Sequence, residues 1–443
     1  MHTQLSRHRW LSGAAVATVA TLAMVGLSAC SSDSATNGSA DELNILLHSN
    51  PPTDKALTAM TEAFEEANPD IKVNLDFVQT NDLPSTRSAR LAAGKVDITE
   101  GSTGIAAQPL PDYVTGTPES DWIKGVDAGN WVDLGDQEFL ANYLPEVVDA
   151  LSVDGKTYQV PTSLNYYTGV YYNKELFAKA GVTSAPTTWT EFVAAMKALD
   201  KNNIIPFSIG GKDNWPVGLI PKAAMQSAFP TVDDRVNLEK ALWDGSAAWN
   251  DPALVTVMDQ TETVYEYADP SFAGVDYATA QGQFAGGQTA MTIDGTWAAT
   301  LFTETNPNLD YGFFPFPGSE NAADNQTLGG KIDFTFAVPT SSKNQDAALR
   351  WIAYFSEPSN YATFAVDGGV IPAQPGVELS AALDPIKPYL ETFQLGWEDI
   401  FHTSSGSPKT LNYADIAPMG KIDSASEAQD RAQQEWLAAT TGN

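Results

Sequence analysis

Short apolar runs alternate with amphipathic stretches in the first part of this chain, and this alternation constrains the fold more than any other feature. Residues 43–47 form an apolar strand-like run, and residues 54–68 carry apolar side chains at helical spacing. Residues 71–77 alternate apolar and polar side chains, which is typical of a half-buried strand. A helix near 85–93 and a strand at 96–99 are expected next. This order predicts an α/β fold with a largely parallel sheet.

A second block of the same kind begins near residue 168. Residues 169–172 predict a strand, residues 188–191 have the form of a helix capping box, and residues 204–209 predict another strand. Later helices or strands are expected at 219–229, 252–268, 334–339 and 345–355. We therefore expect two α/β lobes and not one large sheet.

The only cysteine, Cys30, lies at the end of an uncharged N-terminal stretch. The uncharged stretch covers residues 10–29. Arg7 and Arg9 precede it, and small residues stand directly before the cysteine. A basic segment, an apolar segment and small residues are typical of an export signal. A cysteine at this place resembles the lipobox of bacterial lipoproteins, in which the thiol is acylated. The pattern predicts a signal peptide over residues 1–29 and lipidation of Cys30.

Other interpretations of this segment remain open. A lone cysteine is often a buried core residue, but residues 31–39 are a Ser-, Asp- and Gly-rich tract that does not form a core. An uncleaved membrane helix would be long enough, but polar residues such as Thr18 and Thr21 weaken it. Secretion with cleavage and without a lipid is a third possibility. Residues 30–41 are predicted to be a flexible linker.

The charge of the chain limits its partners. Lys and Arg number 24 against 55 Asp and Glu, which gives a formal net charge of −31. Such an acidic surface repels nucleic acid and anionic lipid, so we expect no nucleic-acid partner and no membrane contact except through a lipid anchor. Neutral or cationic ligands remain. With no cysteine other than Cys30, no disulfide is expected.

Five motifs follow one another in an order that is specific when they are taken together. They are AFEEANPDIKV at 63–73, RLAAGKVD at 90–97, GKTYQVP at 155–161 leading into VYYNKELF at 170–177, FAGGQTAMTIDGTW at 284–297 and DGGVIPA at 367–373. With these motifs the chain resembles the extracellular solute-binding proteins of carbohydrate ABC importers, the group that contains maltose-binding protein.

This resemblance implies two discontinuous lobes that are joined by strands crossing near 163–168, 328–333 and 368–373. Lobe 1 is expected at 42–165 and 333–369, and lobe 2 at 166–332 and 370–443. The implied function is a monomeric substrate-binding lipoprotein, without catalytic activity, cofactor or metal, at the extracellular face of a Gram-positive cell membrane. It would capture a neutral oligosaccharide between the lobes and deliver it to the ABC permease.

Aromatic side chains are the first candidates for contact with a sugar. Sugars present flat C–H faces and rings of hydroxyls, so their sites combine aromatic rings with hydrogen-bonding groups. Trp297 and Trp215 match aromatic positions of the family. Tyr166 and Tyr167 lie at the first crossing, where strand alternation allows only one of them to face a ligand. Trp397 is a more distant candidate, and each of these residues could instead belong to a core.

Polar candidates lie near the ends of predicted strands. His48, Asn50 and Glu100 follow the first and third strands, where ligands of open α/β sheets bind. Asp294 and Asp333 lie beside the expected crossings. A solvated loop or a helix cap is the default role of such residues.

Sequence signatures of enzymes were sought as an alternative to a binding protein. The motifs G-x-S-x-G, P-loop, G-x-G-x-x-G and H-E-x-x-H do not occur in the sequence. Beyond the leader, His48 and His402 are the only histidines in the sequence. A histidine-rich zinc site is therefore not available, and a Ser-His-Asp triad would have to use one of these two residues. Two alternatives remain open. One is a secreted glycoside hydrolase lipoprotein with an Asp/Glu pair. The other is the same fold binding a cation such as a polyamine through aromatic faces.

Overall fold

A computed structural model describes residues 41–390, 394–404 and 410–440. Cys30, the predicted signal peptide and most of the predicted linker lie outside these described residues. Within the described ranges, no helix has both the length and the hydropathy that a membrane crossing requires.

The first sheet is parallel, as the sequence predicts, with the strand order β2-β1-β3. Its strands are β1 (Asp41–His48), β2 (Ile71–Val78) and β3 (Ile98–Thr99). The helices of this part, which we call lobe 1, are α1 (Pro51–Ala67), α2 (Leu83–Ala92), α3 (Asp121–Asp127), α4 (Pro145–Leu151), α12 (Gln345–Ser356) and α13 (Pro358–Gly368). The amphipathic pattern positions α1, because its apolar face buries Leu57 and Phe64 against the sheet.

The second sheet has the order β6-β7-β5-β8, and its central strand β5 runs antiparallel to both neighbours. Its strands are β5 (Gly169–Asn173), β6 (Ile205–Phe207), β7 (Thr289–Asp294) and β8 (Tyr311–Pro315). The helices of this part, lobe 2, are α5 (Lys174–Lys179), α6 (Trp189–Lys201), α7 (Trp215–Ala228), α8 (Val232–Asp244), α9 (Pro252–Glu266), α10 (Tyr277–Ala285), α11 (Ala299–Thr305) and α14 (Ala425–Thr440). The sheet of lobe 2 is therefore mixed, unlike that of lobe 1.

The start of α6 shows only half of the capping box that the sequence predicts. The Thr188 hydroxyl accepts a hydrogen bond from the Glu191 amide, as expected. The Glu191 carboxylate, however, accepts hydrogen bonds from the amide and hydroxyl of Thr187, one residue before the cap. The helix still begins where the pattern places it, because the Thr188 hydroxyl satisfies one of its free amide groups.

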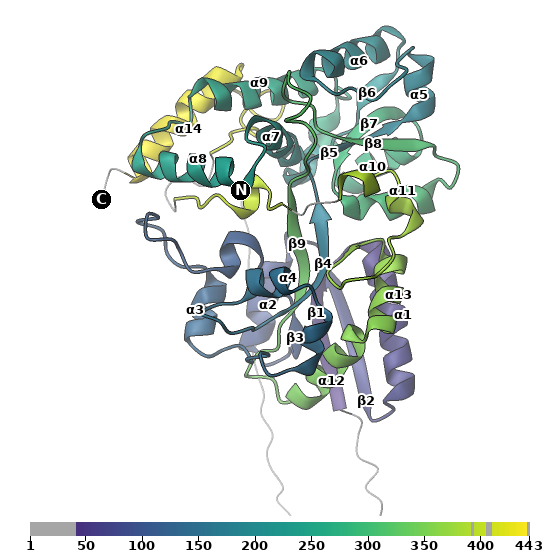
Figure 1. The fold of residues 1–443 in the computed structure, drawn as a ribbon, viewed down its shortest axis with the longest axis vertical. Helices are drawn as coiled ribbons and strands as arrows, with labels where there is room; N and C mark the ends of the chain where they lie inside the picture. The colour runs from purple at the N-terminus through teal and green to yellow at the C-terminus, as the bar shows by residue number, and fades with distance from the viewer. Residues whose placement is uncertain (1–40, 391–393, 405–409, 441–443) are drawn as a thin grey trace, which may run out of the picture. The chain divides into compact units, whose positions relative to one another are not determined.

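A third sheet contains the segments that are expected to cross between the lobes (Figure 1). It has the order β10-β4-β9 and is antiparallel, with β4 (Val160–Tyr166), β9 (Gly330–Phe336) and β10 (Ile371–Pro372). The chain passes from β4 directly into β5 of lobe 2, and β9 leads from lobe 2 back to α12 of lobe 1. The exact residue limits of the two lobes stay a prediction.

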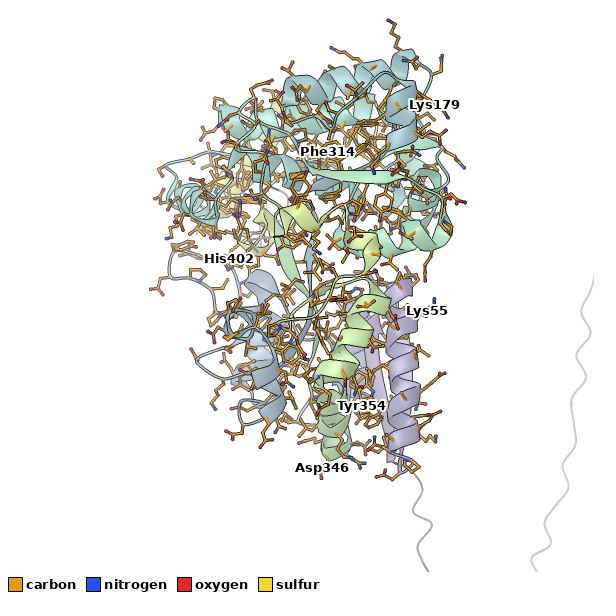
Figure 2. All side chains as sticks on the ribbon, turned by 45° about the vertical axis from the view of Figure 1, so that its right-hand side comes forward. Lys55, Lys179, Phe314, Asp346, Tyr354 and His402 are labelled. Carbon is orange, nitrogen blue, oxygen red and sulfur yellow. The ribbon has the colours of Figure 1, made fainter. Side chains whose placement is uncertain are left out.

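Two large apolar clusters form the core. The first fills lobe 1 and continues along the crossing strands to one side of the lobe 2 sheet, where it includes Tyr171 and Phe302, and the second fills the rest of lobe 2. Trp351 and Phe355 are fully buried in the first cluster, and Phe192 and Trp249 in the second. Figure 2 shows Tyr354 on α12 of lobe 1 and Phe314 within the sheet of lobe 2. Burial of a large apolar side chain contributes about 1.5–3 kcal/mol, so both clusters stabilise the fold.

Candidate functional site

A cavity of about 210 Å³, which we call the central cleft, lies between the two lobes. Its lining side chains come from the end of β1 and from β9 on one side, and from α7, α10 and the turn after β7 on the other. They are His48, Ser49, Asn50, Thr80, Asn81, Tyr167, Trp215, Leu219, Lys222, Tyr277, Trp297, Lys331, Asp333 and Glu398. An adjoining cavity of about 540 Å³ shares Asn50, Trp215, Tyr277 and Trp297 with it. Among the sequence candidates, the structure brings His48, Asn50, Tyr167, Trp215, Trp297 and Asp333 together here.

The ring of Trp297 is held in the cleft by a chain of hydrogen bonds. Trp297 lies in a short 3-10 helix directly after β7, and its Nε1 donates to the Tyr277 hydroxyl at 2.8 Å. That hydroxyl donates to Asp294 Oδ1 at 2.9 Å and accepts from Gln281 Nε2 at 2.7 Å. Asp294 is buried behind these residues and does not line the central cleft. Its burial raises the pKa of its carboxyl to about 7. Asp294 therefore positions the tryptophan through Tyr277.

Three aromatic rings, those of Trp215, Tyr277 and Trp297, form what we call the aromatic cluster. The centroids of Trp215 and Tyr277 are 4.5 Å apart with an interplanar angle of 60°, and those of Trp215 and Trp297 are 6.2 Å apart. Gly295 allows this arrangement, because a Cβ atom there would lie 2.2 Å from Cζ3 of Trp297. Trp215 and Trp297 are only half-buried, so apolar ring surface is open to the cleft.

Two ion pairs line the cleft. Lys331 Nζ lies 3.0 Å from Asp333 Oδ1, and Asn165 Nδ2 donates to Asp333 Oδ2 at 2.5 Å. Burial alone would raise the pKa of Asp333, but the neighbouring Lys331 and His48 hold it below its ordinary value. Lys222 on α7 pairs with Glu398. Each lysine of the cleft thus stands beside a carboxylate of its own.

His48 is fixed at the end of β1 by Glu100. Its Nδ1 lies 2.9 Å from Glu100 Oε1, which also accepts a hydrogen bond from the His48 amide at 2.6 Å. Burial alone would lower the pKa of His48, but Glu100 and, at longer range, Asp333 raise it above its ordinary value. The imidazole stacks on Phe334 with 4.0 Å between the ring centroids. Glu100 does not line the central cleft and orients the histidine that does.

Phe334 has a backbone conformation that is rare for a bulky residue. Its φ angle is +41°, in the middle of the crossing strand β9. Conformations of this kind cost on the order of 1–3 kcal/mol, and they cluster at functional sites. The strained position lies directly after Asp333 and under His48.

Tyr166 and Tyr167 follow the alternation that the sequence predicts. Tyr166 is buried in the apolar cluster of lobe 1 and does not line the central cleft, whereas Tyr167 lines it. The Tyr167 hydroxyl donates to Asp399 Oδ2 at 3.2 Å. Tyr167 is therefore the residue of this pair that reaches the cleft.

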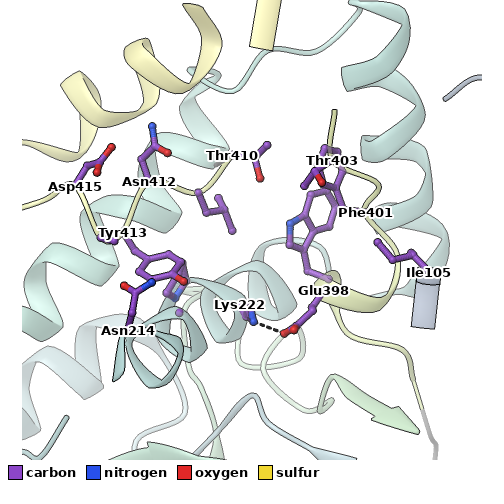
Figure 3. Close-up of a pocket in the computed structure, with 15 residues that line it drawn as sticks. Ile105, Asn214, Lys222, Glu398, Phe401, Thr403, Thr410, Asn412, Tyr413 and Asp415 are labelled. Carbon is purple, nitrogen blue, oxygen red and sulfur yellow. Dashed lines mark hydrogen bonds and ion pairs between the residues drawn. The ribbon is translucent and has the colours of Figure 1, made fainter. Parts of the chain in front are cut away.

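Trp397 lies outside the central cleft. Its side chain is 4% exposed and stacks on Phe401, with 4.8 Å between the ring centroids. It lines a separate cavity of about 310 Å³ between α7 and the described parts of the segment from 397 to 415 (Figure 3). Lys222 and Glu398 line both cavities, and their ion pair stands between them. The structure thus gives Trp397 a packing role behind this pair.

Several lining residues were not expected from the sequence. Tyr277 begins α10, and Lys222 lies inside α7, where nothing in the local pattern distinguishes it from a solvated lysine. Glu398 follows Trp397 in a short 3-10 helix, Trp397–Asp399, that the sequence did not connect with the cleft. Lys331 stands in the predicted crossing segment, but its position is equally typical of a surface charge. In the part of the chain that the structure describes, no three His, Cys, Asp or Glu side chains are grouped for a metal ion.

Comparisons with known proteins agree with this architecture. The sequence model of a family described as "Bacterial extracellular solute-binding protein" matches residues 49–362. An "Uncharacterized ABC transporter extracellular-binding protein" of Pyrococcus horikoshii is 25% identical over 346 residues, which cover 76% of this chain and 72% of that protein. A "Probable sugar-binding periplasmic protein" of Rhizobium meliloti is 24% identical over 285 residues, which cover 63% of this chain and 64% of that one.

A solved structure shares the fold. The structure titled "SBP RafE in complex with raffinose" superposes with a TM-score of 0.72 at 24% sequence identity, and the match covers 90% of this chain and 99% of that one. At this identity the likeness concerns the arrangement of the backbone and not the ligand.

Proposed function

Because the chain belongs to the bacterial extracellular solute-binding protein family, we propose that it is the substrate-binding subunit of an ABC importer and that its ligand is a neutral oligosaccharide. The observation that carries this proposal is the aromatic cluster, which stands beside hydrogen-bonding side chains in a cleft between two lobes. The names of two relatives, one an ABC transporter binding protein and the other a sugar-binding protein, and the raffinose complex of a structural neighbour support the same class of ligand.

The chemistry of the central cleft suits a sugar. When a pyranose face of about 50 Å² stacks on an aromatic ring, removal of this apolar surface from water contributes roughly 1 kcal/mol to the binding free energy. Two or three such rings are therefore needed for binding, and hydrogen bonds then set the specificity. Trp215 and Trp297 offer such faces. Asn50, Asn81 and Asp333 offer amide and carboxylate groups for hydroxyls.

Binding is coupled to a movement of the lobes in this proposal. The crossing strands β4 and β9 connect the lobes, so a change in a few of their backbone angles would close the cleft around a sugar. The closed form would then dock on the permease. No chemical step is proposed for the bound sugar, and neither a cofactor nor a metal is required.

The place of action follows from the N-terminal pattern and the family. We infer that the chain works as a monomer at the extracellular face of the membrane and that an acylated Cys30 anchors it there. A receptor on a lipid anchor suits a Gram-positive cell, which has no enclosed periplasm. A mass of the mature protein that shows Cys30 without a lipid would contradict the anchor.

Calorimetry with raffinose, maltotriose and xylotriose tests the function. We expect at least one of them to bind, and Trp297→Ala and Trp215→Ala each to lower its affinity by more than about tenfold, because each removes an apolar face from the cleft. Trp189→Ala is the matched control, since this half-buried tryptophan packs on Phe192 and Phe316, away from the cleft. Normal binding by both cleft variants would contradict the site, and release of shorter sugars would indicate a hydrolase.

A further inference from the structure

The faces of two aromatic rings in the central cleft already carry cations of the protein itself. Lys331 Nζ lies over the ring of Trp297, 5.4 Å from its centroid. Lys222 Nζ lies over the ring of Tyr167, 6.0 Å from its centroid. Both distances are within the range in which an ammonium group is attracted by an aromatic face. Trp297 is the more exposed of these two rings, so a ligand that approaches it in the cleft meets the Lys331 ammonium there.

Both ammonium groups are held in place by carboxylates. Asp333 binds Lys331 at 3.0 Å, and Glu398 pairs with Lys222. The side chains of Lys331 and Lys222 are 31% and 20% exposed. Burial lowers the pKa of Lys331, but Asp333 and Glu398 outweigh this and raise it above its ordinary value. Lys331 is therefore charged at neutral pH.

These positions bear on the charge of the ligand. A cationic ligand gains from aromatic rings by placing its charge over a ring face. At Trp297 such a charge would come within a few ångströms of the Lys331 ammonium, which repels it, and Asp333, 3.0 Å from that ammonium, offsets only part of this repulsion. An anionic ligand meets the paired carboxylates Asp333 and Glu398 instead. An uncharged ligand avoids both costs.

We propose that Lys331 is a specificity-determining residue, which excludes cationic ligands such as protonated amino sugars and polyamines from the Trp297 ring. The N–H groups that Asp333 does not use remain free to donate to the hydroxyls of an uncharged sugar. This inference rests on the proposed function and extends it, because it names the residue that selects between neutral and cationic ligands.

The experiment directly measures the affinity of the protein for cationic ligands. The probes are the fully deacetylated glucosamine trimer and spermidine at about pH 6, where amines of these kinds are protonated. They are compared by calorimetry with raffinose, maltotriose and xylotriose. For the full chain we expect cation binding at least about tenfold weaker than that of the best neutral sugar. In Lys331→Met the affinity for the glucosamine trimer should rise about tenfold, because the variant removes the positive charge beside the ring and leaves Asp333 unpaired.

Three further variants control for other effects. Lys331→Gln repeats the loss of charge with a side chain that can still donate a hydrogen bond, in case the methionine variant is poorly folded. Lys331→Arg keeps the charge and should keep cations excluded. Lys156→Met removes the same charge from an exposed lysine that is 60% accessible and pairs with Asp133 outside the cleft, so it should change nothing.

The outcomes separate the two proposals. A rise in cation affinity in both uncharged variants, but not in Lys331→Arg or Lys156→Met, supports the inference. Unchanged cation affinity in both uncharged variants, or wild-type affinity for the glucosamine trimer equal to that for neutral sugars, overturns the inference and leaves the proposed function standing. If no neutral sugar binds, the proposed function fails and the role of Lys331 fails with it.

Discussion

At the scale of residues, the orientation of the aromatic cluster depends on a carboxyl that solvent does not reach. The Asp294 carboxylate accepts a hydrogen bond from the Tyr277 hydroxyl, and this hydroxyl accepts a hydrogen bond from Nε1–H of Trp297. The sequence pointed to Trp297 as a match to an aromatic position of the family, and to Asp294 as a residue beside an expected crossing. It did not point to Tyr277, which begins another helix and meets them only after β7 has paired within its sheet.

The buried carboxyl of Asp294 makes the free energy of unfolding depend on pH. Its pKa is raised from 3.8 to about 7 in the folded state, so the folded protein binds its proton more tightly than the unfolded chain does. This contribution to stability is therefore present at low pH and is lost as the pH rises from about 4 to 7. In Asp294→Asn this pH-dependent contribution to stability is absent, because the asparagine side chain does not titrate.

We expect the wild type to lose, relative to Asp294→Asn, on the order of 2 kcal/mol of unfolding free energy between about pH 5 and pH 7. Urea denaturation at the two pH values measures this difference. Asp399, whose burial also raises its pKa to about 7, is present in both proteins and cancels. Equal pH dependence of the two proteins would contradict the raised pKa of Asp294.

At the scale of elements, most strands and helices of the first block agree with the sequence pattern. β2 occupies residues 71–78 where 71–77 was expected, and α12 occupies 345–356 where 345–355 was expected. Strong periodicity explains this agreement, since each of these segments buries one face. The mixed direction of the second sheet could not be predicted, because strand direction depends on which distant segments pair.

A contact between elements of the two lobes gives a test at this scale. The hydroxyl of Tyr113, in the segment between β3 and α3, donates to Glu239 Oε2 on α8 at 2.6 Å. The other oxygen of Glu239 accepts a hydrogen bond from the His402 amide at 2.8 Å. Glu239 is 2% exposed, so solvent could hardly replace a lost donor.

Tyr113→Phe should lower the free energy of unfolding by about 1–3 kcal/mol, because it leaves a buried carboxylate oxygen without its donor. Chemical denaturation measures the loss. The control is Tyr354→Phe, on a half-buried ring of α12 that packs edge-on against Phe64. Equal stability of wild type and Tyr113→Phe would show that this hydrogen bond contributes nothing.

At the scale of the whole molecule, the crossing strands connect two lobes, and one apolar cluster continues from lobe 1 into lobe 2. The sequence predicted both the crossings and the aromatic candidates through the order of its motifs. It also named Trp397 as a more distant candidate and Tyr166 as one of a pair of which only one could face a ligand, and the structure buries both in apolar clusters. Local pattern does not distinguish these aromatic residues from Trp215, because all of them stand beside turns or strand ends.

Closure of the lobes should be visible in solution. When a binding sugar saturates the full chain, small-angle X-ray scattering should show a smaller radius of gyration, because the lobes approach each other about β4 and β9. Trp297→Ala at the same sugar concentration should show a smaller change, since less protein is in the bound form. A radius of gyration that is unchanged at saturation would exclude the closing movement.

The sequence by itself determined the α/β class, the extent of the strongly periodic elements, the acidic charge and the family, because these depend on local periodicity, composition and motif order. Only the tertiary structure decided which candidates share a cleft. It placed Asp294 and Glu100 behind the residues they orient, and it brought Lys222, Lys331 and Tyr277 to the aromatic faces. The physical reason is that these contacts join positions far apart in the chain, and their geometry exists only once both sheets and the crossing strands have paired.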